Sequence, residues 1–200
     1  MKKNLTIMCT LIAVAFTFIS CASNNVVSKE AGFADEKAVI EADAFQEIKT
    51  GKTVKGELTQ KSIHIEDASN GSVPVAVYKL TLEANKRYIL TLKSIPNGLI
   101  TFDMDKKTAM IPASMLYDEE MNIVNHEKRS GRAVAPTATE PMTFQVTQIW
   151  TPEKSGTYYL VVKADMSSDQ GLTLTMYNYQ TSTDVYFRRV PYAKYSVEVQ

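Results

Sequence analysis

Residues 75–82 read VAVYKLTL, and this stretch decides the fold class. Tyr78, Leu80 and Leu82 alternate with polar residues, so their side chains share one face of an extended strand. Short runs of the same kind continue from Thr53 to the end of the chain, rich in Val, Ile, Thr and Tyr and separated by Gly, Asn, Pro and Ser. This pattern is typical of an all-β sandwich or barrel.

Nine strands are expected, and turn-forming residues separate them. They cover residues 53–58, 62–66, 75–82, 87–93, 99–103, 143–150, 156–163, 172–179 and 195–199. The polar connection 83–86 is short enough for a hairpin loop, so we expect the two strands that flank it to be antiparallel neighbours.

Three segments carry a resemblance to a known family: VYKLTL at 77–82, KRYILTL at 86–92 and SGTYYLVV at 155–162. With YSVEV at 195–199 as the closing strand, residues 53–199 resemble the bacterial pre-peptidase C-terminal domain. The resemblance implies an antiparallel, jelly-roll-like β-sandwich. That family is commonly an appendage of secreted peptidases, and no peptidase sequence accompanies it here, so the resemblance implies an accessory or binding role. An unrelated β-sandwich is the alternative, because a Gly-Thr-Tyr turn into a strand also suits other secreted sandwiches.

A long polar insertion is expected at about 106–142, and the sandwich does not need it. Apolar clusters between Met110 and Tyr117 indicate that part of it packs. Lys128, Arg129 and Arg132 could together meet an acidic partner or headgroup. The alternative interpretation is a solvated loop.

The N-terminus predicts an exported lipoprotein. Two lysines precede an apolar run at 5–19, which is shorter than the roughly 20 residues that a membrane-spanning helix needs. Phe18-Ile19-Ser20-Cys21 resembles a lipobox, although Phe18 departs from the usual Leu. We therefore expect residues 1–20 to be a signal peptide and Cys21 to carry the covalent lipid. The alternative is ordinary cleavage at Ser20-Cys21-Ala22, which would release a soluble protein.

Lipidation would decide the location of the domain. Several acyl chains, of the palmitate kind, would anchor it firmly, since each buried methylene contributes about 0.8 kcal/mol. Ala22 follows the lipidated position, and by the enterobacterial sorting rule the absence of Asp there favours the outer membrane. The expected location is thus the bacterial envelope, on its periplasmic or surface side.

Residues 21–52 are expected to be a tether, because they are polar and lack strand alternation. Within them, Ala34 to Ile48 contains good helix formers with apolar residues spaced by three, which favours one short helix. The alternative is that this helix packs on the sandwich.

Charge and cysteine content restrict the partners. Cleavage would remove Lys2 and Lys3, leaving 20 of the 22 basic residues beside all 22 acidic ones, which argues against a nucleic-acid partner. Of the two cysteines, Cys9 would leave with the signal and Cys21 would be acylated. No disulfide is then expected, and stability must come from the core.

No catalytic pattern is found downstream of the signal. The mature chain has two histidines, His64 and His126, and neither an HExxH nor a G-x-S-x-G motif. No enzyme and no cofactor other than the lipid is expected. Asp103 and Asp105 are weak candidates for calcium ligands, since their spacing matches no EF-hand loop.

The aromatic residues suggest a binding platform. If Leu172, Leu174 and Met176 face the core, Tyr177 and Tyr179 face outward and could stack on a glycan or a protein. A cross-strand ladder covered by a neighbour is the alternative.

Taken together, these features predict a membrane-anchored envelope lipoprotein that acts as a non-enzymatic binding or surface-interaction module for a glycan or protein ligand. An accessory subunit of an envelope protein complex is the alternative. A secreted hydrolase-associated domain is the third choice.

Overall fold

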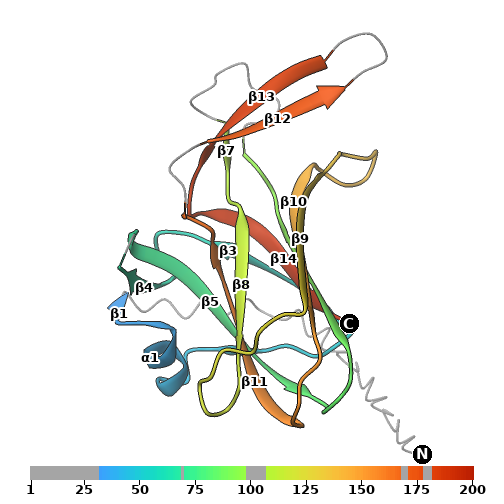
Figure 1. Ribbon diagram of the computed structural model, residues 1–200. Coiled ribbons are helices and arrows are strands. Elements are labelled where there is room, and N and C mark those ends of the chain that lie inside the picture. Colours follow the sequence, from blue (N-terminus) through green and yellow to red (C-terminus); the bar gives the residue numbers. More distant parts are fainter. Residues whose placement is uncertain (1–31, 69, 98–106, 168–170, 178–181) are drawn as a thin grey trace, which may run out of the picture.

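The computed structural model describes residues 32–68, 70–97, 107–167, 171–177 and 182–200. In these ranges the chain forms fourteen strands and one short helix, and two large sheets pack face to face (Figure 1). The predicted all-β sandwich is thereby confirmed. No helix in these ranges is long and apolar enough to cross a bilayer.

Sheet I contains six strands and sheet II contains five. Along sheet I the order is β1 (Gly32–Phe33), β4 (Ile63–Asp67), β5 (Gly71–Leu82), β11 (Gly156–Ala164) and β8 (Pro112–Tyr117), and β2 (Gln46–Glu47) also pairs with β5. Along sheet II the order is β3 (Thr53–Leu58), β14 (Ala193–Val199), β6 (Tyr88–Ser94), β10 (Thr143–Trp150) and β9 (Lys128–Val134). Pairing is antiparallel except that β1 and β2 run parallel to their neighbours.

A third, smaller sheet projects from one end of the sandwich (Figure 1). It consists of β12 (Leu172–Tyr177), β13 (Ser182–Arg189) and β7 (Thr108–Ala109). Phe187 of β13 meets Phe144 of β10 edge to face, with ring centroids 5.8 Å apart. This aromatic contact, together with buried Val185 and Met142, fastens the base of the projecting sheet to sheet II.

The main core lies between sheets I and II. Tyr78, Leu80 and Leu82 all point into it, which confirms the face predicted from the alternation of β5. Trp150 of β10 is 2% exposed in the same core.

The expected hairpin between β5 and β6 is wrong. β5 pairs with β4, β11 and β2, whereas β6 pairs with β10 and β14, so residues 83–87 cross from one sheet to the other. The Glu83 N–H donates to Tyr88 Oη (2.9 Å) and holds this crossing. β5 and β6 lie in different sheets, but both direct their apolar side chains into the same core. Those side chains are therefore buried although the two strands are not hydrogen-bonded to each other. Alternation shows which side chains are buried, but not which strands are partners.

The expected insertion at 106–142 also differs from the structure. It contributes β7, β8 and β9, and the last two are edge strands of sheets I and II. β9 reads KRSGRAV and is exposed over its first five residues, so it shows no apolar alternation by which it could be recognised. β13 was missed as well, and the expected strand at 99–103 lies outside the described residues.

The segment 32–48 is docked on sheet I and is not a free tether. Its helix is shorter than expected: α1 covers Glu36–Glu41, with the Asp35 side chain accepting from Ala38 N at its start and Asp43 at φ 53° just after its end. Val39 and Ile40 are buried against the outer face of sheet I. The alternative interpretation of the helix, packed on the sandwich, is the one observed.

A buried tyrosine pair joins the two sheets. Tyr78 of β5 and Tyr195 of β14 share a hydrogen bond of 2.6 Å between their hydroxyl oxygens. Burial raises the pKa of both hydroxyls, that of Tyr195 well above its ordinary value, so the pair stays neutral. The Tyr195 ring lies across Gly56, its cross-strand partner on β3, where an added Cβ would come within 2.5 Å of the ring.

Gly56→Ala is therefore expected to destabilise the fold by about 1 to 3 kcal/mol, because the new methyl group must displace Tyr195 from the packed core. Gly131→Ala on β9 is the matched control, since an added Cβ there has no atom closer than 3.9 Å. Urea unfolding of the two variants measures the difference. Equal midpoints would show that Tyr195 moves aside freely and does not depend on Gly56.

Val39→Ala should destabilise by about 2 kcal/mol, because Val39 is completely buried where α1 meets sheet I. Lys37→Ala, on the exposed side of the same helix, should change stability by less than about 0.5 kcal/mol. Urea unfolding measures both, and the rate of tryptic cleavage at Lys49 reports whether the docked segment has loosened. Unchanged cleavage in Val39→Ala would contradict the docking contact.

Candidate binding surfaces

The three cations predicted as one site on β9 do not act together. Arg129 pairs with Gln148 of β10, which is 2% exposed and points into the sandwich, so Arg129 lies on the inward side. Lys128 and Arg132 have the opposite parity and point outward from sheet II. The structure thus divides the predicted basic site between two faces of one edge strand.

Arg129 forms an ion pair that joins sheet II to sheet I. Its Nη2 lies 3.7 Å from Asp165 Oδ2, beyond the end of β11. Asp165 also accepts hydrogen bonds from Ser167 Oγ (2.6 Å) and Ser167 N (3.1 Å). These hydrogen bonds, and then the two nearby arginines, hold the pKa of the Asp165 carboxyl below its ordinary value.

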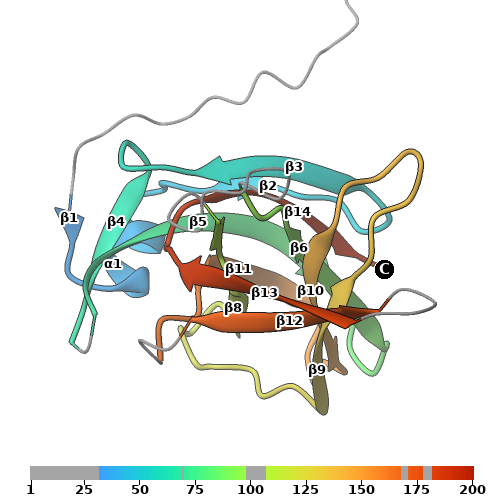
Figure 2. The same ribbon diagram turned by 90° about the horizontal axis from the view of Figure 1, so that it is seen from above.

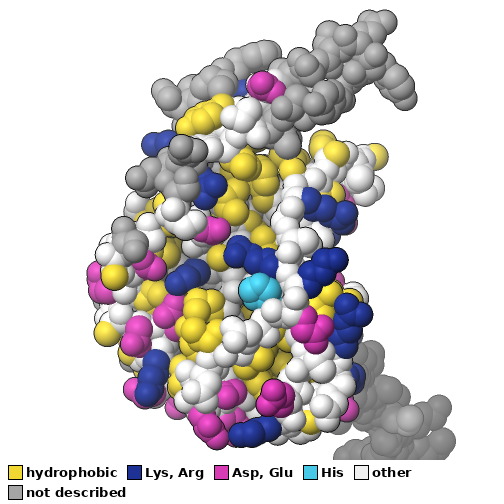
Figure 3. Space-filling model, viewed as in Figure 1, with side chains coloured by type: hydrophobic (Ala, Val, Ile, Leu, Met, Phe, Trp, Pro, Cys, Tyr) yellow, Lys and Arg dark blue, Asp and Glu magenta, His cyan; other side chains and the backbone are white. Residues whose placement is uncertain are grey.

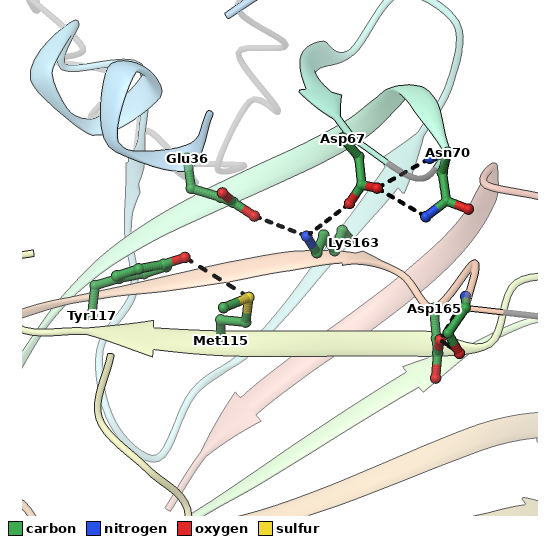
Figure 4. Close-up of polar contacts among 8 residues, drawn as sticks. Glu36, Asp67, Asn70, Met115, Tyr117, Lys163 and Asp165 are labelled. Atoms are coloured by element: carbon green, nitrogen blue, oxygen red, sulfur yellow. Dashed lines mark hydrogen bonds and ion pairs between the residues drawn. The ribbon is translucent and has the colours of Figure 1, made fainter. Parts of the chain in front are cut away.

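Lys163 lines a hollow of about 660 Å³ together with Arg129 and Asp165. Its ammonium group points at Glu36 and Asp67 (Figure 4). Its Nζ lies between two carboxylates, 2.9 Å from Glu36 Oε1 and 3.8 Å from Asp67 Oδ2, and its side chain is 18% exposed. Asp67 in turn accepts from the backbone and side chain of Asn70. Because Lys163 bridges β11, α1 and the end of β4, its charge secures the docked segment and is already neutralised.

Tyr117 borders the same outer face of sheet I. Burial, reinforced by the carboxylates of Glu36 and Asp35, raises the pKa of Tyr117 to about 12. Its hydroxyl points at Met115 Sδ, 3.8 Å away (Figure 4). A neutral phenol on a thioether is a packing contact and supplies no acid or base at ordinary pH.

The Tyr78–Tyr195 pair lines a second opening, between β3 and β5, of about 180 Å³. Ligand pockets usually occupy roughly 300 to 1,000 Å³. The opening is therefore too small for an ordinary ligand, and its hydroxyls already bond to each other.

An acidic turn follows β8 but does not form a metal centre. Asp118 accepts from Glu120 N and Asn122 N, and Glu119 accepts from Thr157 N (2.8 Å). These carboxylates shape the turn. Over the described ranges no group of three His, Cys, Asp or Glu residues is placed to hold a metal ion.

The outer face of sheet II, called here the open face, has no covering element among the described residues. Its outward residues are polar or charged with few exceptions. They are Thr53, Lys55 and Glu57 on β3, Lys194, Ser196 and Glu198 on β14, Ile89, Thr91 and Lys93 on β6, Thr143, Gln145, Thr147 and Ile149 on β10, and Lys128, Ser130, Arg132 and Val134 on β9. Five cations stand against two carboxylates, so this face is basic although the chain has a net charge of zero.

The balancing acids lie elsewhere. Seven lie on and around α1, β2 and β4: Asp35, Glu36, Glu41, Asp43, Glu47, Glu66 and Asp67. Of these elements, α1 and β4 stand on the side of the molecule opposite β9 and β10 (Figure 2). Lys and Arg side chains gather beside β9 in the space-filling view (Figure 3). Three of the seven acids are paired with lysines, Glu41 with Lys37 and both Glu36 and Asp67 with Lys163, so the charge of the acidic side is partly balanced.

Several residues proposed from the sequence cannot be placed. Cys21, Asp103, Asp105 and Tyr179 lie outside the described residues, and Tyr177 lies in β12 without a described side chain. Of the histidines, half-buried His64 has Nδ1 2.6 Å from Ser62 O, and His126 is exposed before β9.

Sequence reasoning missed the lysines of the open face. Lys55 and Lys93 each occupy an outward position in a correctly predicted strand, beside inward Val54 and Leu92. That signal was present in each strand separately. Only the pairing register shows that these lysines lie in line with Arg132.

Comparison with known proteins gives little further guidance. No protein-family model and no curated protein matches the chain. Among solved structures, it is similar to the pre-peptidase C-terminal domain of a collagenase from Bacillus anthracis, with 13% identity and a TM-score of 0.34, over 78% of this chain and 93% of that one. Similarity at this level assigns neither a family nor a function.

The Asp165 contacts predict a pH dependence of stability. Because folding lowers the pKa of Asp165, its stabilisation is present above the unfolded pKa of about 3.9 and disappears as the pH falls through the lower folded pKa. Asp165→Asn should therefore be less stable than wild type at pH 7, by about 1 kcal/mol, and the difference should vanish in strong acid. Urea unfolding across this pH range measures it.

Glu47→Gln, which changes an exposed carboxylate on β2, is the control and should follow wild type at every pH. A stability gap for Asp165→Asn that persists unchanged into strong acid would mean that the substitution acts through packing and not through the carboxylate charge.

Proposed function

We propose that this protein is a bacterial envelope lipoprotein, anchored through a lipid on Cys21, whose sandwich serves as a non-enzymatic binding module. The open face is the binding surface. The anchor is supported by the sequence from the two N-terminal lysines to Cys21, and the binding role by the contrast between the two outer faces of the sandwich.

That contrast is the observation that carries the proposal. The outer face of sheet I is covered by the chain itself, through α1 and the neighbouring side chains of Phe33, Ala44 and Phe45, and forms a second hydrophobic cluster. The open face displays hydroxyl, amide and ammonium groups on five adjacent strands. A sheet face that combines charge with hydrogen-bonding side chains suits a polar ligand with many contacts, such as a glycan or an acidic protein surface.

An accessory subunit of an envelope complex is the second candidate. β9 is the last strand of sheet II and could receive a strand from a partner, a mode in which the backbone supplies the hydrogen bonds. Its exposed Lys128 and Arg132 oppose this, since charged edge strands discourage pairing with other chains. The ligand-binding role is therefore preferred.

Labelling with a clickable palmitate analogue tests the anchor. Wild type should incorporate the label and partition into the detergent phase, and its mature form should begin at Cys21. Cys21→Ser should remain unlabelled because it has no thiol to acylate. The measurement is in-gel fluorescence, with the intact mass of the mature protein.

Ser20→Ala serves as the matched control, because it changes a neighbouring residue but keeps the thiol and a small residue before it. It should be labelled like wild type. An unlabelled wild-type product that begins beyond Cys21 would make the protein a soluble secreted domain and refute the anchor.

A further inference from the structure

Three cations form a line across the open face. Lys55 on β3 is joined through Ser196 to Lys93 on β6, and Lys93 is joined through Gln145 to Arg132 on β9, since these residues are cross-strand partners in register. This set, Lys55, Lys93 and Arg132, is called the cationic row. Its cations stand on alternate strands with neutral side chains between them.

The cationic row forms no ion pair over the described residues. Two carboxylates share the open face with it: Glu57, two residues from Lys55 on β3, and Glu198 on β14. Hydrogen bonds from Gln200 (2.6 Å) and Thr53 (3.0 Å), and then the charge of Lys93, lower the pKa of Glu198. With three cations and no direct ion pair, the row keeps a net positive charge toward solvent.

A second line of polar groups runs beside the cationic row. It consists, across the five strands, of Thr53, Glu198, Thr91, Thr147 and Ser130. Four of these side chains are hydroxyls, which both donate and accept hydrogen bonds. None of the outward residues of the five strands is aromatic, and Tyr192, just before β14, lines a hollow beside Glu57 and Lys194 at one border of the open face.

The spacing of the row restricts the ligand. Neighbouring strands lie about 4.8 Å apart, so cations on alternate strands are roughly 10 Å apart at the backbone. This is about the length of two linked pyranose rings. A linear polysaccharide that carries a negative group on every second sugar would place one anion at each cation. Its sugar hydroxyls would then face the neighbouring hydroxyl line, formed by Thr53, Thr91, Thr147 and Ser130.

The twist of sheet II favours a chain-like ligand over a flat membrane surface. Adjacent strands rotate by about 20 to 25°, so the directions of β3 and β9 differ by roughly 90°. A twist of this size makes a flat bilayer surface a poorer fit to Lys55 and Arg132 together. A polymer chain can follow the twisted surface from one edge strand to the other.

We propose that the cationic row and its neighbouring hydroxyl line bind a linear acidic polysaccharide, which runs across the strands of sheet II with its carboxylates or sulfates at Lys55, Lys93 and Arg132. Arg132 can hold a carboxylate through two parallel hydrogen bonds, and the two lysines act as point charges. This inference rests on the proposed binding role of the open face, and it identifies the ligand class.

Fluorescein-labelled hyaluronan oligosaccharide, which has one carboxylate per disaccharide, is the probe. The full mature protein, purified in a neutral detergent, should raise its anisotropy. Binding should weaken between 0.01 M and 0.1 M salt, where the Debye length falls from about 30 to about 10 Å. Each of Lys55→Gln, Lys93→Gln and Arg132→Gln should weaken binding about two- to fivefold, and the triple variant about 10- to 100-fold.

The control is the triple variant Lys37→Gln, Lys86→Gln and Lys154→Gln. It loses the same charge from α1 and from two loops away from the open face, and it should bind like wild type. Thermal unfolding checks that both triple variants are folded. An equal loss of binding in both triple variants would show that binding depends only on the net charge of the protein. That result would overturn the proposed site.

Competition identifies the partner class. Neutral dextran should not displace the probe, and unlabelled hyaluronan should. Displacement by polyglutamate or by phosphatidylglycerol in mixed micelles at lower concentrations than hyaluronan would overturn the polysaccharide in favour of an acidic protein or a lipid surface. The assay does not depend on acylation, so failure of the Cys21 anchor would leave its result intact.

Discussion

The architecture depends on burying both faces of β5. Its even-numbered residues Tyr78, Leu80 and Leu82 form the core with sheet II, and its odd-numbered residues Val73, Val75 and Val77 form the second cluster with α1. An isolated two-sheet sandwich would leave that valine face exposed to water. This would cost roughly 25 cal/mol of folding free energy for each square ångström of apolar surface. The chain before β3 must therefore lie against sheet I.

This constraint also decides which outer sheet face stays uncovered. Because the docked segment covers sheet I, sheet II retains the one broad outer sheet face that the described elements leave open. The acids around α1, β2 and β4 are displaced to the covered side, where Glu36 and Asp67 hold Lys163. Packing and electrostatics together produce a basic face on a chain of zero net charge.

Strand prediction succeeded where one face was apolar and the other polar. The first and last residues of β3 and β10 were predicted correctly, because the alternation of apolar and polar residues starts and stops at the ends of these strands. It failed for β9, whose first five residues are exposed and show no apolar alternation, and for β8, whose apolar residues were attributed to an insertion. The helix was overextended, since Val39 and Ile48 belong to different buried clusters and not to one helical face.

The sequence by itself determined the all-β class and the inward face of the central strands, because each of these is a local pattern of polarity. Tertiary structure alone decided which strands pair, that residues 83–87 cross between sheets, and that Arg129 turns inward to Asp165. It also decided that Lys55, Lys93 and Arg132 share one line. Register between strands distant in sequence follows from the packing of the whole core, and no local pattern encodes it.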